Sequence, residues 1–105
     1  MKIQVIQGDS GYDYQFTLQK ADGSVTDLTG ATLTMKGVHN QFSSKTMSKE
    51  IGIEDAENGV ALYTIGADDF PVDGIYYGEI EAVYGSGKKI TFKDLTIEVL
   101  PNAGA

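Results

Sequence analysis

Apolar and polar side chains alternate along most of this chain, and this period of two constrains the fold more than any other feature. From Tyr12 to Gln19 the even positions carry Tyr, Tyr, Phe and Leu, whereas the odd positions carry Asp, Gln, Thr and Gln. Successive side chains of a β-strand point to opposite faces of a sheet, so the pattern predicts a strand with one buried face. The 3.6-residue period of an amphipathic helix is not the dominant one.

The alternation recurs along the chain at regular spacing. Asp-Gly and Asn-Gly pairs separate several of the segments, and such pairs adopt positive φ in tight turns at low cost. Many short strands at this spacing are typical of a two-sheet sandwich and not of a βαβ fold. We expect seven or eight strands, near residues 3–5, 12–18, 31–36, 47–53, 60–65, 75–84 and 90–99. The expected core includes Tyr14, Phe16, Leu18, Leu33, Leu62, Ile80 and Ile97.

The last expected strand changes phase in its middle. Ile90 and Phe92 are apolar at even positions, whereas the apolar residues of 95–99 stand at odd positions. A regular strand cannot bury both sets on one face without an extra residue. The sequence therefore predicts a β-bulge or a break near Lys93 and Asp94.

Two segments between the expected strands have their own patterns. Residues Ala67–Phe70 predict a single helical turn that Asp68 could cap. The segment Gly37–Lys45 is polar apart from Val38 and Phe42, and we expect a loop or a mobile edge there.

The length indicates one domain. A chain of 105 residues has the size of a single domain and no room for two cores. We expect the sandwich at residues 1–100 and a linker or disordered tail at residues 101–105, because Pro101 cannot donate to a sheet. No segment resembles a secretion signal or reaches the ~20 apolar residues of a membrane helix, so a cytosolic origin is the default expectation.

The charge balance argues against several classes of partner. Fifteen acidic residues stand against eight lysines, with no arginine, and the formal net charge is −7. Nucleic-acid binding depends on clustered Lys and Arg, and an anionic membrane repels an acidic surface. We therefore expect neither partner.

Few residues could carry chemistry, because the chain has no cysteine and one histidine. His39 lies in the polar segment, where a solvated loop histidine is the favoured interpretation. Glu79 and Glu81 share one face of an expected strand, where solvated carboxylates are commoner than a glycosidase pair. We expect no catalytic residue and no cofactor.

Acidic turns raise the question of calcium. Asp68, Asp69 and Asp73 form the better of two acidic clusters and are weak calcium candidates. Neither cluster has the spacing of an EF-hand loop, and turn or cap roles explain the aspartates equally well.

Six tyrosines are the mildly informative excess in the composition. Most lie on expected core faces, whereas Tyr77 points away from the core. Tyrosine is enriched at protein interfaces and also stacks on sugar rings. Together with Val38 and Phe42 in the polar segment, Tyr77 is a possible partner contact; residues 1–7 and 37–45 are the segments where we first expect contacts.

Several segments, in order, resemble one family of phage proteins. The stretch from Asp22 to Leu33, DGSVTDLTGATL, resembles a "DG-x-V-x-DLTGA" segment of phage structural domains. Residues 55–60 (DAENGV), 73–80 (DGIYYGEI) and 89–92 (KITF) match further pieces, as does Gly8-Asp9 before a long strand. The family is the N-terminal domain of upper baseplate proteins from phages of Gram-positive hosts, and the matches span nearly the whole chain.

This resemblance implies an all-β, immunoglobulin-like sandwich of two antiparallel sheets in a virion. It further implies a non-catalytic structural or adaptor domain, made in the host cytoplasm, that contacts other virion proteins or copies of itself. The longer baseplate proteins continue beyond this domain, so a head decoration or tail accessory protein would fit equally well. A carbohydrate-binding module that recognises a cell-surface glycan is the alternative, and a small hydrolase would rest on His39.

Overall fold

The computed structural model describes residues 1–103, and within that range the chain forms strands and no helix. Among these residues no helix is long and apolar enough to cross a membrane. The all-β prediction and the strand count are confirmed, and each expected segment contains one strand. The strands are β1 (Lys2–Ile6), β2 (Asp13–Thr17), β3 (Ala31–His39), β4 (Thr46–Asp55), β5 (Val60–Thr64), β6 (Gly74–Tyr84) and β7 (Lys89–Leu100).

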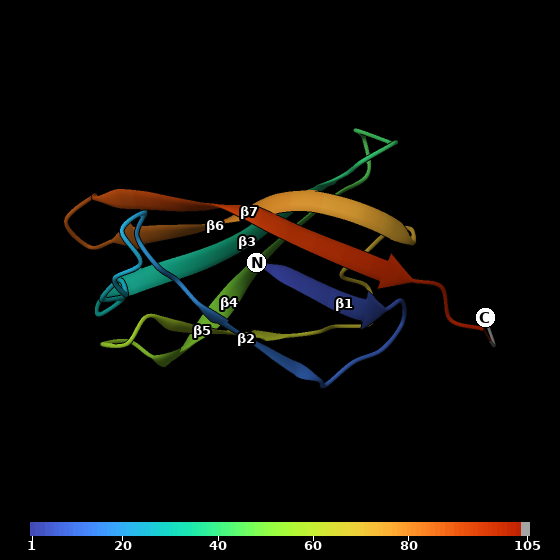
Figure 1. Ribbon diagram of the computed structural model, residues 1–105. Helices are drawn as coiled ribbons and strands as arrows, with labels where there is room; N and C mark the ends of the chain where they lie inside the picture. The colour runs from blue at the N-terminus through green and yellow to red at the C-terminus, as the bar shows by residue number, and fades with distance from the viewer. Residues whose placement is uncertain (104–105) are drawn as a thin grey trace.

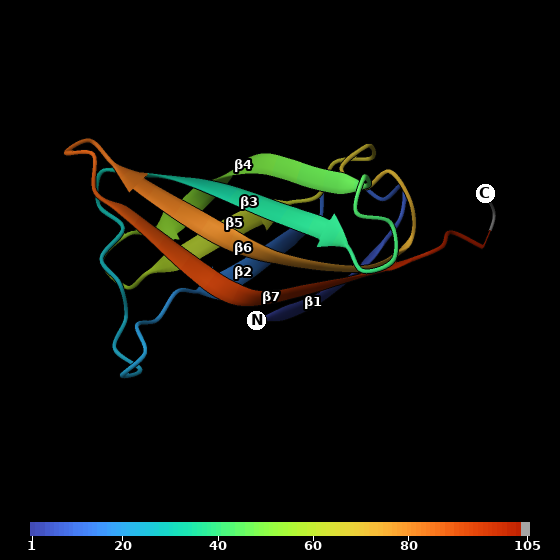
Figure 2. The same ribbon diagram turned by 90° about the horizontal axis from the view of Figure 1, so that it is seen from above.

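Strand β4 joins the two halves of the structure. Its first part pairs with β3 up to Ile51, and its second part pairs with β5 from Gly52 onward. All seven strands therefore form one sheet in the order β1-β7-β6-β3-β4-β5-β2. The sheet folds over into a nearly barrel-shaped structure, with β2 and β5 opposite β3, β6 and β7 (Figures 1 and 2).

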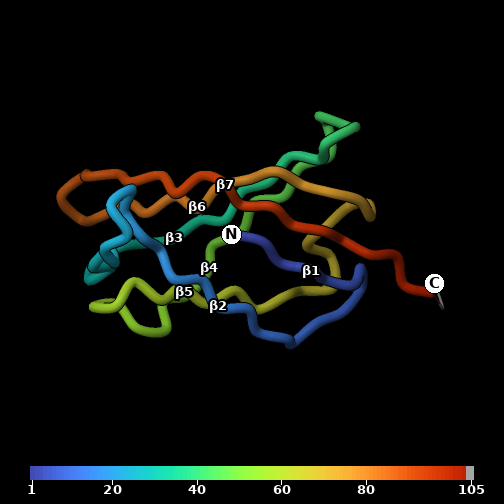
Figure 3. The backbone as a smooth tube through the Cα atoms, in the orientation of Figure 1, coloured from blue at the N-terminus to red at the C-terminus, as the bar shows by residue number. Residues whose placement is uncertain are grey.

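This connectivity corrects one part of the expected architecture. We expected two antiparallel sheets, but β1 runs parallel to β7, from Lys2 opposite Thr96 to Ile6 opposite Leu100. No turn links these two strands, because they lie at opposite ends of the chain, so no hairpin dictates their direction. Figure 3 shows the N-terminal segment beside the end of β7. The immunoglobulin-like arrangement of two separate sheets is not confirmed.

The bulge in β7 is confirmed at the expected place. Gly78 pairs with Leu95 and Ile80 pairs with Phe92, so Lys93 and Asp94 on β7 face the single residue between them on β6. Asp94 has a φ of 64°, the one positive value of a non-glycine residue among residues 1–103. Phe92 and Leu95 are both buried as a result.

The core lies between the two halves of the folded sheet, and two assignments to it were wrong. Leu62 is only partly buried, because β5 points Ala61 and Tyr63 inward; the apolar run of β5 has no alternation that could reveal its inner face. Tyr12 precedes β2 and is 63% exposed. The other expected core residues are buried or, in the case of Tyr14, packed against the core.

The predictions for the two irregular segments need correction. Strand β3 continues to His39, so the connecting loop covers only residues 40–45. Residues 67–69 form a turn and not a helix, in which the Asp69 amide donates to the Gly66 carbonyl at 3.2 Å. Asp69, and not Asp68, accepts the Gly66 amide, because it is also held by Tyr63 and Lys49.

The expected tail begins after β7 ends at residue 100, and residues 104–105 lie outside the described residues.

Two strand glycines provide a test of how closely β3 and β6 approach beside the bulge. A Cβ on Gly78 would collide with the Lys36 carbonyl of β3, whereas a Cβ on Gly52 would meet its nearest atom, the Leu62 carbonyl, at an ordinary 3.7 Å. We expect Gly78→Ala to lower the free energy of unfolding by about 1–3 kcal/mol, the usual cost of overpacking. Gly52→Ala is the matched control and should be neutral or slightly stabilising. Urea unfolding of both variants measures this, and equal stabilities would contradict the packing described.

Candidate interaction surface

Two of the three expected partner contacts lie side by side on the outer face of the sheet. Val38 of β3 pairs with Tyr77 of β6, and their side chains are 44% and 59% exposed. Directly opposed side chains on neighbouring strands are within contact distance of each other. The pair therefore forms one small apolar area, which we call the Val38–Tyr77 patch.

Polar side chains flank this patch along the same row of the sheet. Thr46 of β4 pairs with Val38, Thr96 of β7 pairs with Tyr77, and Lys2 of β1 pairs with Thr96. An apolar centre with a polar rim is the usual composition of a protein interface. The strand pairing was needed to identify Thr46 and Thr96, because alternation shows which face a residue occupies but not its neighbours.

Ion pairs occupy the next part of this face. Glu81 lies 3.2 Å from the Lys36 ammonium and 3.4 Å from the Lys89 ammonium. The hydrogen bond from Lys36 is the main cause that holds the pKa of Glu81 below its ordinary value. Glu81 is thus an ion-paired residue and not the freely solvated one that the sequence suggested. One carboxylate thus pairs with two ammonium groups on this face.

His39 is buried, contrary to the prediction of a solvated loop histidine. Its side chain is only 5% exposed at the end of β3, and its ring meets the edge of Tyr76. The Nδ1 atom accepts the backbone amides of Gln41 (3.1 Å) and Phe42 (3.2 Å). The ring hydrogen is therefore on Nε2, which donates to the Asp73 carbonyl at 2.9 Å. His39 thus ties the loop after β3 to the turn before β6.

The third expected contact, Phe42, depends on this arrangement. Its ring stacks on the His39 ring with 5.1 Å between centroids, yet the side chain remains 54% exposed. The loop is closed by a hydrogen bond from the Lys45 amide to the Phe42 carbonyl. Phe42 is therefore held in a defined position at one end of the sheet, separate from the Val38–Tyr77 row.

The weak calcium candidates are not gathered into one site. The Asp69 carboxylate accepts hydrogen bonds from Tyr63 Oη (2.6 Å), Gly66 N (2.8 Å) and Lys49 Nζ (3.0 Å). Burial acts to raise the pKa of Asp69, but these hydrogen bonds outweigh it and leave the pKa below its ordinary value. Asp68 and Asp73 are exposed. Over residues 1–103, no group of three or more histidine or acidic side chains is placed to hold a metal ion.

The role of His39 can be tested by removing its ring. His39→Ala leaves the amides of Gln41 and Phe42 and the carbonyl of Asp73 without this partner. We expect a loss of about 1–3 kcal/mol in the free energy of unfolding, as for other buried polar groups that lose their partners. Gln41→Ala is the control, because it removes an exposed side chain from the same loop and should change stability by less than about 0.5 kcal/mol.

Chemical denaturation gives both values. A His39→Ala variant as stable as the control would show that the histidine does not hold the loop.

Comparison with known families gives one match that covers almost the whole chain. The model of the BppU N-terminal domain matches residues 1–104. A search of curated proteins finds no match.

Proposed function

Since the chain belongs to the family of BppU N-terminal domains, from the baseplate upper protein of phages, we propose that it is a non-catalytic adaptor that holds its position in the virion through protein–protein contacts. Membership of a baseplate family makes it a structural component of the virion that contacts other virion proteins. To this family membership we add a proposed mode of action, binding without catalysis, and a proposed contact surface. The Val38–Tyr77 patch is the central contact, and Phe42 is a second one.

One observation carries the choice of surface. Tyr77 and Val38 are exposed side chains in the middle of the sheet, where β3 and β6 each have a paired strand on both sides. Strands held on both sides offer a rigid surface, so little conformational entropy is lost when a partner binds. Tyrosine side chains are prominent among the residues that dominate binding energies.

The environment of His39 supports a non-catalytic role. A general base needs a free ring nitrogen within reach of a substrate, whereas both nitrogens of His39 are engaged by backbone groups. Of the two glutamates considered as a glycosidase pair, Glu79 and Glu81, the second is held in ion pairs by Lys36 and Lys89. These contacts favour a binding role over the hydrolase alternative.

A substitution in the patch tests the adaptor proposal. Tyr77→Glu places a charge in the proposed interface and should cost about 2 kcal/mol or more in binding, as expected for a central tyrosine. Tyr12→Glu is the matched control, since Tyr12 is equally exposed but lies before β2. With each variant encoded in the phage, mass spectrometry of purified virions measures how much of the protein is incorporated.

We expect Tyr77→Glu to be depleted from virions and Tyr12→Glu to be retained, with both variants folded. Equal incorporation of both would reject this surface. If Tyr77→Glu is incorporated normally but abolishes binding of particles to host-cell glycans, the carbohydrate-binding alternative replaces the adaptor role of the patch.

A further inference from the structure

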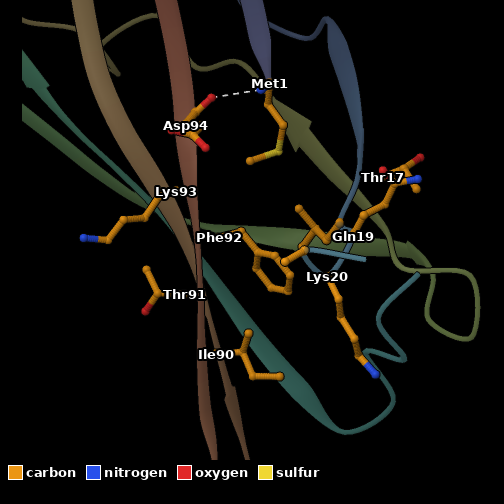
Figure 4. A pocket seen from close by; sticks show the side chains of 11 residues that line it. Met1, Thr17, Gln19, Lys20, Ile90, Thr91, Phe92, Lys93 and Asp94 are labelled. Carbon is orange, nitrogen blue, oxygen red and sulfur yellow. Dashed lines mark hydrogen bonds between the residues drawn. The ribbon is translucent and has the colours of Figure 1, made fainter. Parts of the chain in front are cut away.

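A groove of about 550 Å³ lies where the folded sheet fails to close, between β7 and the end of β2. Residues 17–21 line one side, residues 90–94 line the other, and Met1 lies at one end (Figure 4). This groove lies at the open seam of the sheet, whereas the Val38–Tyr77 patch lies on its central strands; Lys93 and Asp94 lie between the two. Sequence patterns gave no indication of it.

Strand β1 covers only half of this edge of β7. It pairs with Thr96–Leu100, beyond the bulge. At the bulge, the Met1 ammonium donates to the Asp94 carbonyl and the Thr96 amide donates to the Met1 carbonyl, both at 2.8 Å. Among residues 1–103, no strand pairs with Ile90–Lys93 on this side. The position that β1 fills beside one half of β7 is therefore empty beside the other half.

The backbone of β7 points hydrogen-bonding groups at this empty position. In an antiparallel pair, hydrogen-bonded and non-hydrogen-bonded residue pairs alternate. The Tyr84 amide donates to the Lys88 carbonyl, so Tyr84 and Lys88 are a hydrogen-bonded pair. From Lys88 onward every second residue of β7 is hydrogen-bonded to β6, and Thr91, opposite Glu81, is one of the residues in between. The backbone N–H and C=O of Thr91 therefore point away from β6 and toward the groove.

The other wall of the groove has the same alternation. The Leu18 amide donates to the Gly59 carbonyl of the β5 side, so the backbone groups of Thr17 point toward the groove.

The side chains at the groove alternate in the same way. Ile90 and Phe92 point into the groove, toward Gln19 and Lys20, whereas Thr91 points to the other side of β7 (Figure 4). An extended strand laid beside β7 would bring every second side chain onto Ile90 and Phe92. The groove thus combines unpaired backbone groups with the partly exposed Ile90 and the largely buried Phe92. Unpaired backbone groups beside side-chain pockets are the features used when a peptide adds a strand to a sheet edge.

We propose that this groove binds an extended segment of a partner polypeptide, which pairs with Ile90–Lys93 in line with β1 and places apolar side chains on Phe92. The inference rests on the proposed function, since it assigns the domain a second protein contact. The occupant is a polypeptide strand because unpaired backbone amides and carbonyls on both walls match the repeat of another backbone. Edge strands of this kind are prone to such pairing unless something covers them.

The test is a selection of linear peptides from a random display library against the folded full chain. Thr91→Pro removes the amide that points to the groove, whereas Thr91→Val keeps that amide and changes only the outward side chain. We expect enriched peptides to bind the wild type and Thr91→Val equally and to bind Thr91→Pro at least tenfold more weakly. Hydrogen exchange of the wild-type Thr91 amide, which needs no variant, should slow at least tenfold when the peptide is added.

Three results would overturn the proposal. The selection could enrich no peptide, the peptides could bind without slowing exchange at Thr91, or light scattering could show a dimer in which the Thr91 amide is already protected. The dimer would identify the occupant as a second copy of the chain. None of these results depends on Tyr77 or on incorporation into virions, so the groove and the Val38–Tyr77 patch can fail independently.

Discussion

Strand β7 has to bury Phe92 and Leu95 on the same face although they stand three positions apart, and the bulge at Lys93 and Asp94 makes this possible. Much of the structure depends on that extra residue. The Asp94 carbonyl accepts a hydrogen bond from the Met1 ammonium, and β1 pairs with β7 beyond the bulge. The open seam between β2 and β7 lies beside residues 90–94, the part of β7 that does not pair with β1. The bulge thus lies between the half of β7 that pairs with β1 and the half that lines the groove.

The rest of the sheet gives the domain two different surfaces. On the central strands, Val38 and Tyr77 present side chains from a backbone that is paired on both sides. At the seam, β7 presents backbone groups that lack a partner strand among residues 1–103. A protein that binds the first surface would be recognised by side-chain complementarity, and one that binds the second by adding a strand. An adaptor with both could contact two neighbours in a baseplate at once.

The features that the sequence predicted are those that depend on neighbours along the chain. Alternation located most of the strands, a bounded apolar run located β5, and the phase change at residues 92–95 located the bulge. The outward position of Tyr77 was identified because it points opposite to Tyr76 in the same strand. Pairing between distant strands could not be read in this way. The parallel β1–β7 pair, the meeting of Val38 with Tyr77 and the seam all follow from the order of strands in the sheet.

His39 and β5 show a second limit. His39 looks solvated in its polar segment, yet backbone groups from Gln41, Phe42 and Asp73 satisfy both ring nitrogens and allow burial. In β5 the residues from Val60 to Tyr63 are apolar at consecutive positions, so packing against the opposite half of the sheet selects Tyr63 for the core.

Hydroxyl-radical footprinting of the free protein and of assembled virions tests most directly whether the Val38–Tyr77 patch is a contact in the particle. Tyr12 serves as an internal reference, because it is exposed but lies outside the patch. We predict that the oxidation rate of Tyr77 falls at least several-fold on assembly while that of Tyr12 changes little. A Tyr77 side chain that is oxidised as fast in virions as in the free protein would contradict the account.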